Sequence, residues 1–351
     1  MLAWTGRLDE ARAELQELRR RCIERGADID LIFISVHTAL VEIWRGRFAD
    51  ATQAAEEAVQ LAEQIGGDHM VVIAKTMRAA AAAYAGREGD ARAAAADAMA
   101  AVERCGTPRL AYWPMRVLGF LEVSLGNYAA AATALAQLCG DFPDMPGTEI
   151  ITAAFIPDAV EALIGLGRFA EAEPMIKSLE HNGRIFGRPW MLAIGARCRA
   201  MLLAAEGDVD AAERAVQEAL TEHGRLSMPF ERARTQLFLG QLQRRRRQKI
   251  STAATLGQAL LAFERMGNSL WAERARAELE RTIVIPMHGG DLTASERRVA
   301  ELAASGMTTA DVAAHICVSA KTVEAHLTRI YRKLDIHSRA ELGRLMRASG
   351  Q

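Results

Sequence analysis

Glycine and alanine recur along residues 1–282 at a nearly constant spacing. Glycines at positions 6, 46, 86, 126, 167 and 207 lie 40, 40, 40, 41 and 40 residues apart. An alanine stands five positions after each glycine, and an apolar residue follows four positions later: Ala11, Ala51, Ala91, Ala131, Ala172 and Ala212, then Leu15, Ala55, Ala95, Leu135, Ile176 and Val216. Apolar positions at helical spacing, repeated at one period, predict an array of helical repeats.

Each repeated glycine is predicted to end one helix and begin the turn to the next, because glycine adopts the left-handed cap conformation without strain. A seventh copy lacks the glycine but continues in phase with Leu256 and Ala259. One helix pair cannot bury its own apolar face, so the pairs must stack. We therefore expect an all-α fold, a curved α-solenoid of about seven helix pairs. Its turn, Gly-x-apolar-x-x-Ala, is tetratricopeptide-like, although that repeat is about 34 residues long.

A different pattern fills residues 292–351. Four hydroxyl residues each precede a possible capping partner by three positions: Thr293 and Glu296, Thr308 and Asp311, Ser319 and Thr322, and Ser338 and Glu341. Such caps mark helix starts and are typically worth about 1 kcal/mol each. They predict helices near 294–304, 309–315, 320–334 and 339–348. The second and third are separated by a tight turn, which is typical of a helix-turn-helix.

The predicted helix 320–334 has one apolar face and one polar face. Val323, Leu327, Ile330 and Leu334 form a stripe of helical period that should face the core. The opposite face carries Lys321, Ala325, Thr328 and Arg332, flanked by Glu324 and Arg329. A positive surface of small residues on the second helix of this motif suits the major groove of DNA.

Candidate base contacts lie in the first half of this helix. Lys321 can pair with guanine acceptors, Glu324 can accept from cytosine N4, and Ala325 and Thr328 can meet a thymine methyl. Substitution of Lys321 should therefore relax sequence preference.

Candidate phosphate contacts lie nearer its end. Arg329, Arg332 and Lys333 would position the domain without selecting sequence, so substitution of Arg332 should weaken binding to all sequences. The alternative for these three residues is a solvated helix face. The caps and the apolar stripe together favour the DNA interpretation.

The same segment resembles the LuxR-type DNA-binding domain. The resemblance is carried by Leu292-Thr293-x-x-Glu296, Gly306, Val312-Ala313, Val318-Ser319-x-Lys321-Thr322-Val323-x-x-His326, Lys333-Leu334 and Ser338-Arg339. It implies a four-helix domain that binds double-stranded DNA as a homodimer, with the third helix in the groove and the fourth at the dimer contact.

The resemblance also implies phosphate contacts for Thr322 and His326. Thr308 and Ser319 complete the predicted phosphate set. For His326, packing at the core edge is the alternative. Thr309 stands where the family often has asparagine, so the phosphate contact of that asparagine is not expected here.

Residues 1–282 resemble the helical-repeat region of the MalT-like regulators of the LuxR group, most clearly at Phe263–Gly267 and Trp271–Leu279. Those regulators carry an N-terminal nucleotide-binding module, but this sequence has no GxxxxGK[ST] loop, so we expect no ATP binding. Because Trp4 and Gly6 align with Trp44 and Gly46, we expect that an earlier part of the first helix is absent and that the first helix exposes apolar surface.

Charge and composition add a local signal and several exclusions. The formal net charge is −1, but from residue 289 onward nine Lys/Arg stand against seven Asp/Glu, which gives +2. This small excess suggests that affinity needs a dimer. The run 244–247 is either a further nucleic-acid contact or a solvated turn, and the turn is favoured.

Five scattered cysteines without a CxxC pair predict reduced, buried thiols in a cytoplasmic protein. Neither a signal peptide nor a membrane-spanning run is present. We expect no metal or cofactor, and no enzyme, because no His or Cys nucleophile arrangement organises the carboxylates.

Pro286, Gly289 and Gly290 break both patterns, so residues 283–291 are predicted to be a linker between the repeat domain, 1–282, and the DNA-binding domain, 292–351. The leading hypothesis is a sequence-specific transcriptional regulator. Its solenoid groove would take an effector ligand or a regulatory protein, and RNA polymerase is a further candidate partner. The alternative is a protein-interaction scaffold whose tail no longer binds DNA, which Glu324 and the small charge excess favour.

Overall fold

The computed structural model describes residues 2–65, 67–142, 149–282, 292, 294–316, 318–334, 336 and 338–348. The chain forms two compact units, residues 1–282 and 283–351. Every regular element in the described residues is a helix, so the predicted all-α class is confirmed. The predicted linker, 283–291, lies outside the described residues. Within the described parts, no helix combines the length and the apolar character needed to cross a bilayer.

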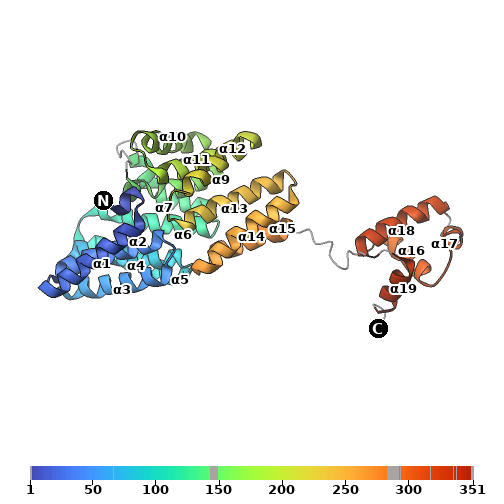
Figure 1. Ribbon diagram of the computed structural model, residues 1–351, viewed down its shortest axis with the longest axis horizontal. Helices are drawn as coiled ribbons and strands as arrows, with labels where there is room; N and C mark the ends of the chain where they lie inside the picture. Colours follow the sequence, from blue (N-terminus) through green and yellow to red (C-terminus); the bar gives the residue numbers. More distant parts are fainter. Residues whose placement is uncertain are drawn as a thin grey trace. The chain divides into compact units, whose positions relative to one another are not determined.

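The first unit is a series of antiparallel helices (Figure 1). They are η1 (Leu2–Thr5), α1 (Leu8–Arg25), α2 (Asp28–Trp44), α3 (Phe48–Ile65), α4 (Asp68–Tyr84), α5 (Glu88–Cys105), η2 (Pro108–Ala111), α6 (Tyr112–Ser124), α7 (Tyr128–Asp141), α8 (Ile150–Ala153), α9 (Ile156–Gly165), α10 (Phe169–Ile185), α11 (Pro189–Glu206), α12 (Val209–His223), α13 (Pro229–Arg245), α14 (Lys249–Met266) and α15 (Ser269–Thr282). Without the single-turn α8, these α-helices form the seven expected pairs.

The repeated glycines and alanines have the roles that the sequence predicts. All six glycines have positive φ and lie between consecutive helices. The six alanines are buried, with at most 5% of their surface exposed. The closest helix packing joins α2 to α3, α4 to α5 and α11 to α12, each pair linked by a repeat turn. Small residues at these contacts let the helix backbones approach each other closely.

The array does not remain an open solenoid. In Figure 1 the chain runs from α1 to α5 at the lower side of the unit and continues through α6 to α12 at the upper side. It then brings α13 to α15 back against the first helices. Phe230 on α13 lies within 5.2–5.9 Å, between ring centroids, of five other aromatic rings. These rings belong to Phe48, Tyr84, Phe120, Phe263 and Trp271, from α3, α4, α6, α14 and α15. The inner face of the first three repeats is therefore covered by the last helices.

Hydrogen bonds fix this seam between the two ends of the array. Asn268 Nδ2 donates to the Tyr84 carbonyl at 2.8 Å, and Asn268 Oδ1 accepts from the Trp271 backbone amide at 2.9 Å. Trp271 Nε1 donates to Ser124 Oγ at 2.9 Å. Asn268 thus caps α15 and joins it to α4 at once. Polar side chains with all partners in place specify a unique packing.

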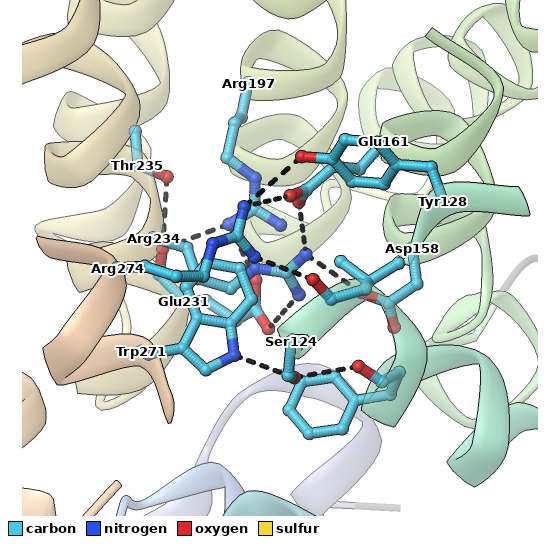
Figure 2. A network of polar contacts seen from close by, with 12 residues as sticks. Ser124, Tyr128, Asp158, Glu161, Arg197, Glu231, Arg234, Thr235, Trp271 and Arg274 are labelled. Carbon is cyan, nitrogen blue, oxygen red and sulfur yellow. Dashed lines mark hydrogen bonds and ion pairs between the residues drawn. The ribbon is translucent and has the colours of Figure 1, made fainter. Parts of the chain in front are cut away.

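A network of buried charges lies next to this seam (Figure 2). Arg234 is 3% exposed, and its Nη2 lies 2.9 Å from Asp158 and 2.8 Å from Glu161. Arg274 Nη2 reaches the other oxygen of Glu161 at 2.9 Å. The guanidinium groups of Arg234 and Arg274 stack on the Trp271 indole at 4.6 and 4.1 Å from its centroid. Charges from α9, α13 and α15 are therefore neutralised by one another in the interior.

Two carboxyl groups of this network, Asp158 and Glu161, titrate differently. Burial raises the pKa of Asp158 to about 6, although Arg234 opposes this effect. Burial acts in the same direction on Glu161, but Arg274 and Arg234 outweigh it and lower the pKa of Glu161 to about 2. Glu161 is therefore a fixed anion of the network.

Arginines 244–247 serve the fold. Arg244 pairs with Glu278 at 3.0 Å, Arg245 donates to the Ala204 carbonyl at 3.3 Å, and Arg246 pairs with Glu213 at 2.9 Å. Arg247 has φ 59° at the position where the repeat expects glycine. The turn interpretation of this run agrees with these contacts.

The exposure of the cysteines and of the first helices differs in part from the expectations. Only Cys198 is fully buried among the four described cysteines, so the expectation of buried thiols is wrong for Cys22, Cys105 and Cys139, which are half-buried. The helix that was expected to expose apolar surface ends at Gly6 and corresponds to η1, where Leu2 and Ala3 are half-buried, while the next helix, α1, exposes Leu18 and Ile23.

Replacing Arg247 with glycine should stabilise the chain by about 0.5–1 kcal/mol, because a side chain with a Cβ is strained in the left-handed region, and glycine's greater freedom when unfolded offsets part of that gain. Urea unfolding measures the change. Arg247→Ala is the matched control and should bring no gain, because it keeps the Cβ. An equal gain from both variants would refute strain as the cause.

Two glycines of equal conformation test the closure of the array. Gly86 and Gly167 both have φ +74°. A Cβ at Gly86 would lie 2.9 Å from Ser269 Oγ and 3.0 Å from Ser269 N, whereas a Cβ at Gly167 would meet nothing within 4 Å. Gly86→Ala should therefore destabilise the chain by about 1 kcal/mol more than Gly167→Ala in urea unfolding. Equal losses would mean that the seam is not packed in solution.

Candidate nucleic-acid interface

The second unit contains four helices at the predicted positions: α16 (Ala294–Ala304), α17 (Thr309–His315), α18 (Ala320–Leu334) and α19 (Arg339–Ala348). Three of the four predicted caps are present. Thr308 Oγ1 accepts from the Asp311 amide at 3.2 Å and Ser319 Oγ from the Thr322 amide at 3.1 Å. Ser338 Oγ accepts from the Glu341 amide at 3.2 Å. The fourth predicted cap, Thr293, lies outside the described residues.

The core of this unit confirms the predicted stripe on α18. Val323 and Ile330 have no exposed surface, Leu327 is 7% exposed and Leu334 is half-buried. They pack against Val299 and other apolar residues of α16, α17 and α19. Burial of this stripe fixes the rotation of α18 about its axis. The opposite face of the helix must therefore point outward.

The candidate base contacts all lie on that outward face. Lys321, Glu324, Ala325 and Thr328 are exposed. Thr328 Oγ1 donates to the Glu324 carbonyl at 2.9 Å, so its hydroxyl hydrogen is engaged within the helix. The methyl group of Thr328 remains for an apolar contact. This agrees with the predicted thymine contact and disfavours Thr328 as a hydrogen-bond donor to a base.

Arg329 extends this face and is also exposed. Among the described residues, neither Arg329 nor Lys321 forms an ion pair, so both cations are available to an anionic partner. The side chain of Arg332 lies outside the described residues, and its predicted phosphate contact stays a prediction.

The predicted phosphate residues at the helix starts use their hydroxyls locally. Thr308 Oγ1 donates to Asp311 Oδ2 at 2.6 Å, and the two hydroxyls of Ser319 and Thr322 lie 2.7 Å apart. The hydrogen bonds from Thr308 hold the pKa of the Asp311 carboxyl below its usual value. A carboxylate beside Thr308 repels phosphate, so this position suits an anion less well than the start of α18.

His326 is half-buried, and its Nδ1 is shielded from solvent without a hydrogen-bond partner among the described atoms. The ring therefore lies at the edge of the core. This placement is compatible with both roles considered for it, packing and phosphate contact.

Two basic residues of the domain are directed to partners inside it. Lys333 Nζ pairs with Glu296, which is 4% exposed, and so joins α18 to α16. Arg339 Nε donates to the Ala303 carbonyl at 3.2 Å, and its Nη2 donates to the Met307 carbonyl. Arg339 thereby satisfies carbonyl groups at and beyond the end of α16.

Lys333 was expected on phosphate, and this internal pairing gives it a structural role that the sequence pattern did not indicate. The signal that could have suggested it is Glu296, a carboxylate that falls on the buried side of its helix.

The comparisons with known proteins agree with this geometry. Residues 291–346 match the family of bacterial regulatory proteins called the luxR family. Over 73 residues the chain is 41% identical to proteins named "Putative HTH-type transcriptional regulator", Rv0890c of Mycobacterium tuberculosis and Mb0914c of Mycobacterium bovis. The matched stretch is 20% of this chain and 8% of each relative. The C-terminal unit therefore carries a luxR-family helix-turn-helix domain.

Replacing Lys333 with methionine should destabilise the second unit by roughly 1 kcal/mol, because the buried Glu296 would lose its ion pair with Lys333, while the partly exposed lysine contributes only a screened charge. Hydrogen exchange of the amides of α16 and α18 measures the loss. Arg329→Met is the matched control and should leave exchange unchanged. Equal protection in both variants would show that the pair contributes nothing to the fold.

Proposed function

We propose that this protein is a sequence-specific DNA-binding transcriptional regulator that acts as a homodimer on a nearly two-fold symmetric site. The observation that carries the proposal is the rotation of α18, which buries Val323 and Ile330 and leaves Lys321, Glu324 and Ala325 exposed. A helix of this kind, entering the major groove, reads bases with the side chains of its first turns. The luxR-family match over 291–346 supports the same conclusion.

These positions suggest which residues of the interface contact bases and which contact phosphate. Lys321, Glu324, Ala325 and Thr328 contact base edges. Arg329 contacts phosphate, together with the start of α18, where Ser319 and Thr322 lie and where backbone amides favour an anion. Arg332 and His326 are proposed as further phosphate contacts. Lys333 and Thr308 are proposed to stabilise the domain through their contacts with Glu296 and Asp311.

The repeat array is proposed as the sensing part, on the pattern of the MalT-like regulators that it resembles. The expected location is the cytoplasm, and RNA polymerase is a proposed partner. Because the inner face of the first repeats is covered by α13 to α15, the array suits a small effector better than a protein lying along a groove.

The alternative is an interaction scaffold with a tail that does not bind DNA. Its support is Glu324 on the outward face and the inward use of Lys333 and Arg339, which reduces the free positive charge further. Selection of duplexes from a random pool by the full chain distinguishes the two. Enrichment of a two-fold symmetric sequence supports the regulator, and binding no tighter than to random duplex at moderate salt contradicts it.

Lys321→Ala and Arg329→Gln should have different effects on that selected site. Lys321→Ala should relax preference at one base pair per half-site, because a base contact is lost. Arg329→Gln should weaken all duplexes similarly and reduce the salt slope of log affinity by about one unit per subunit, because a phosphate contact is lost. Fluorescence anisotropy at several salt concentrations measures both. A sequence-dependent loss in Arg329→Gln would contradict its assignment to phosphate.

A further inference from the structure

A cavity of about 160 Å³ lies beside the buried charges of the repeat array. Its walls come from α7, α9, α11, α13 and α15, which places it where the middle of the array meets the last helices. Exposed Gly165 and Arg245 are part of its lining, so the cavity is accessible from solvent. An apolar cavity of about 150 Å³ in another protein holds a molecule of the size of benzene. The space therefore suits a small organic molecule.

The charges around this cavity are unequal. Four arginines line it, Arg197, Arg234, Arg245 and Arg274, against the single carboxylate of Glu161. Both oxygens of Glu161 are already occupied, one by Arg234 at 2.8 Å and the other by Arg274 at 2.9 Å. Asp158 and Glu231, which also pair with Arg234, are not part of the lining. The lining itself therefore carries more cationic than anionic groups.

Two of these arginines have an unused donor, Arg234 at Nε and Arg197 at Nη2. The Arg197 side chain is 3% exposed, and its Nη1 donates to the Glu231 carbonyl at 3.1 Å and lies 2.7 Å from Glu231 Oε2. Its Nη2 is buried and has no hydrogen-bond partner among the described atoms. A buried guanidinium N–H without an acceptor is costly, and more so than a neutral donor. An acceptor supplied by a ligand would remove that cost.

Apart from Gln241 and the hydroxyl of Tyr128, the rest of the lining is apolar. Ile164, Met201, Leu237 and Phe238 come from α9, α11 and α13. Arginine next to an apolar wall is the pairing that recognises a carboxylate with a short hydrocarbon part, because the guanidinium takes both carboxylate oxygens and the wall takes the remainder.

We infer that this cavity binds a small organic carboxylate, with Arg197 as the anchor of the carboxylate group. The ligand would bridge Arg197 on α11 and Arg274 on α15, and so hold the last helix of the array in place. Binding of the carboxylate does not depend on the proposed function. Only the role of the ligand as the effector of a transcriptional regulator rests on it.

Titration calorimetry of the full chain tests the inference with benzoate and isovalerate as probes. Their neutral amides, benzamide and isovaleramide, are matched in size. We expect each carboxylate to bind at one saturable site per chain and to raise the midpoint of thermal unfolding. The amides should bind at least about tenfold more weakly. Absence of carboxylate binding, or equal binding of the amides, would overturn the inference.

Three variants locate the site. Arg197→Gln should weaken carboxylate binding at least about tenfold. Arg199→Gln is the matched control, because Arg199 lies two residues away on α11 but pairs with Glu173 and Glu180 outside this cavity, and it should bind as the unaltered chain does. Met201→Trp fills the cavity without removing an arginine and should abolish binding, which keeps the test decisive if Arg197→Gln does not fold. Unaltered binding in Met201→Trp would overturn the inference.

Anisotropy with the selected duplex, run in parallel, separates the two proposals. A chain that binds the duplex but neither carboxylate refutes this inference and leaves the proposed function intact. A chain that binds a carboxylate in the expected order of variants, but no duplex, supports the cavity and refutes the proposed function.

Discussion

The contact of Phe230 with aromatic rings from both ends of the repeat array is the interaction on which the first unit depends. A stack of helix pairs buries a continuous core but leaves its inner face without a partner. Here α13 supplies that partner, and Phe230 packs edge-on against Tyr84, whose ring is stacked on Phe120 at 4.0 Å. Aromatic pairs of this kind contribute beyond their burial. The covered face, the polar seam and the buried arginines all follow from this closure.

Closure also explains why so many charges are in the interior. Arg234 and Arg274 lie on helices that face α9 only because the array returns on itself. Trp271 lies between these two arginines, whose guanidinium groups stack on its ring, and Ser124, which accepts a hydrogen bond from its indole N–H. A buried ion pair is weak support for stability, because removal of the charges from water offsets much of their attraction. A mutually neutralised set that leaves two arginine donors unsatisfied, Arg197 Nη2 and Arg234 Nε, agrees with the ligand site inferred above.

The helical class, the number of pairs and the orientation of α18 could be predicted from the sequence because each depends on local periodicity and caps. Closure of the array could not, because it depends on contacts between residues far apart, such as Asn268 with Tyr84. Lys333 and Arg339 were counted as basic surface for the same reason, since composition does not reveal that Glu296 is buried or that Arg339 reaches the end of α16. For Trp271, the sequence showed only that Trp271–Leu279 resembles the end of the repeat region of MalT-like regulators, and not that its ring packs against two arginines.

The seam between the two ends alters how the repeats can unfold and diversify. Ser227 donates to Asp9 at 3.2 Å across 218 positions of sequence, so distant repeats share contacts. Open solenoids are quasi-one-dimensional, and their terminal units fray independently. In a closed array, unfolding of one end exposes the core of the other end, so unfolding is cooperative. Folding is slow, because contacts between residues far apart in the sequence must form. An open stack tolerates duplication or deletion of a single 40-residue unit. In this closed array such a change would move the residues along the seam away from their partners on the other end.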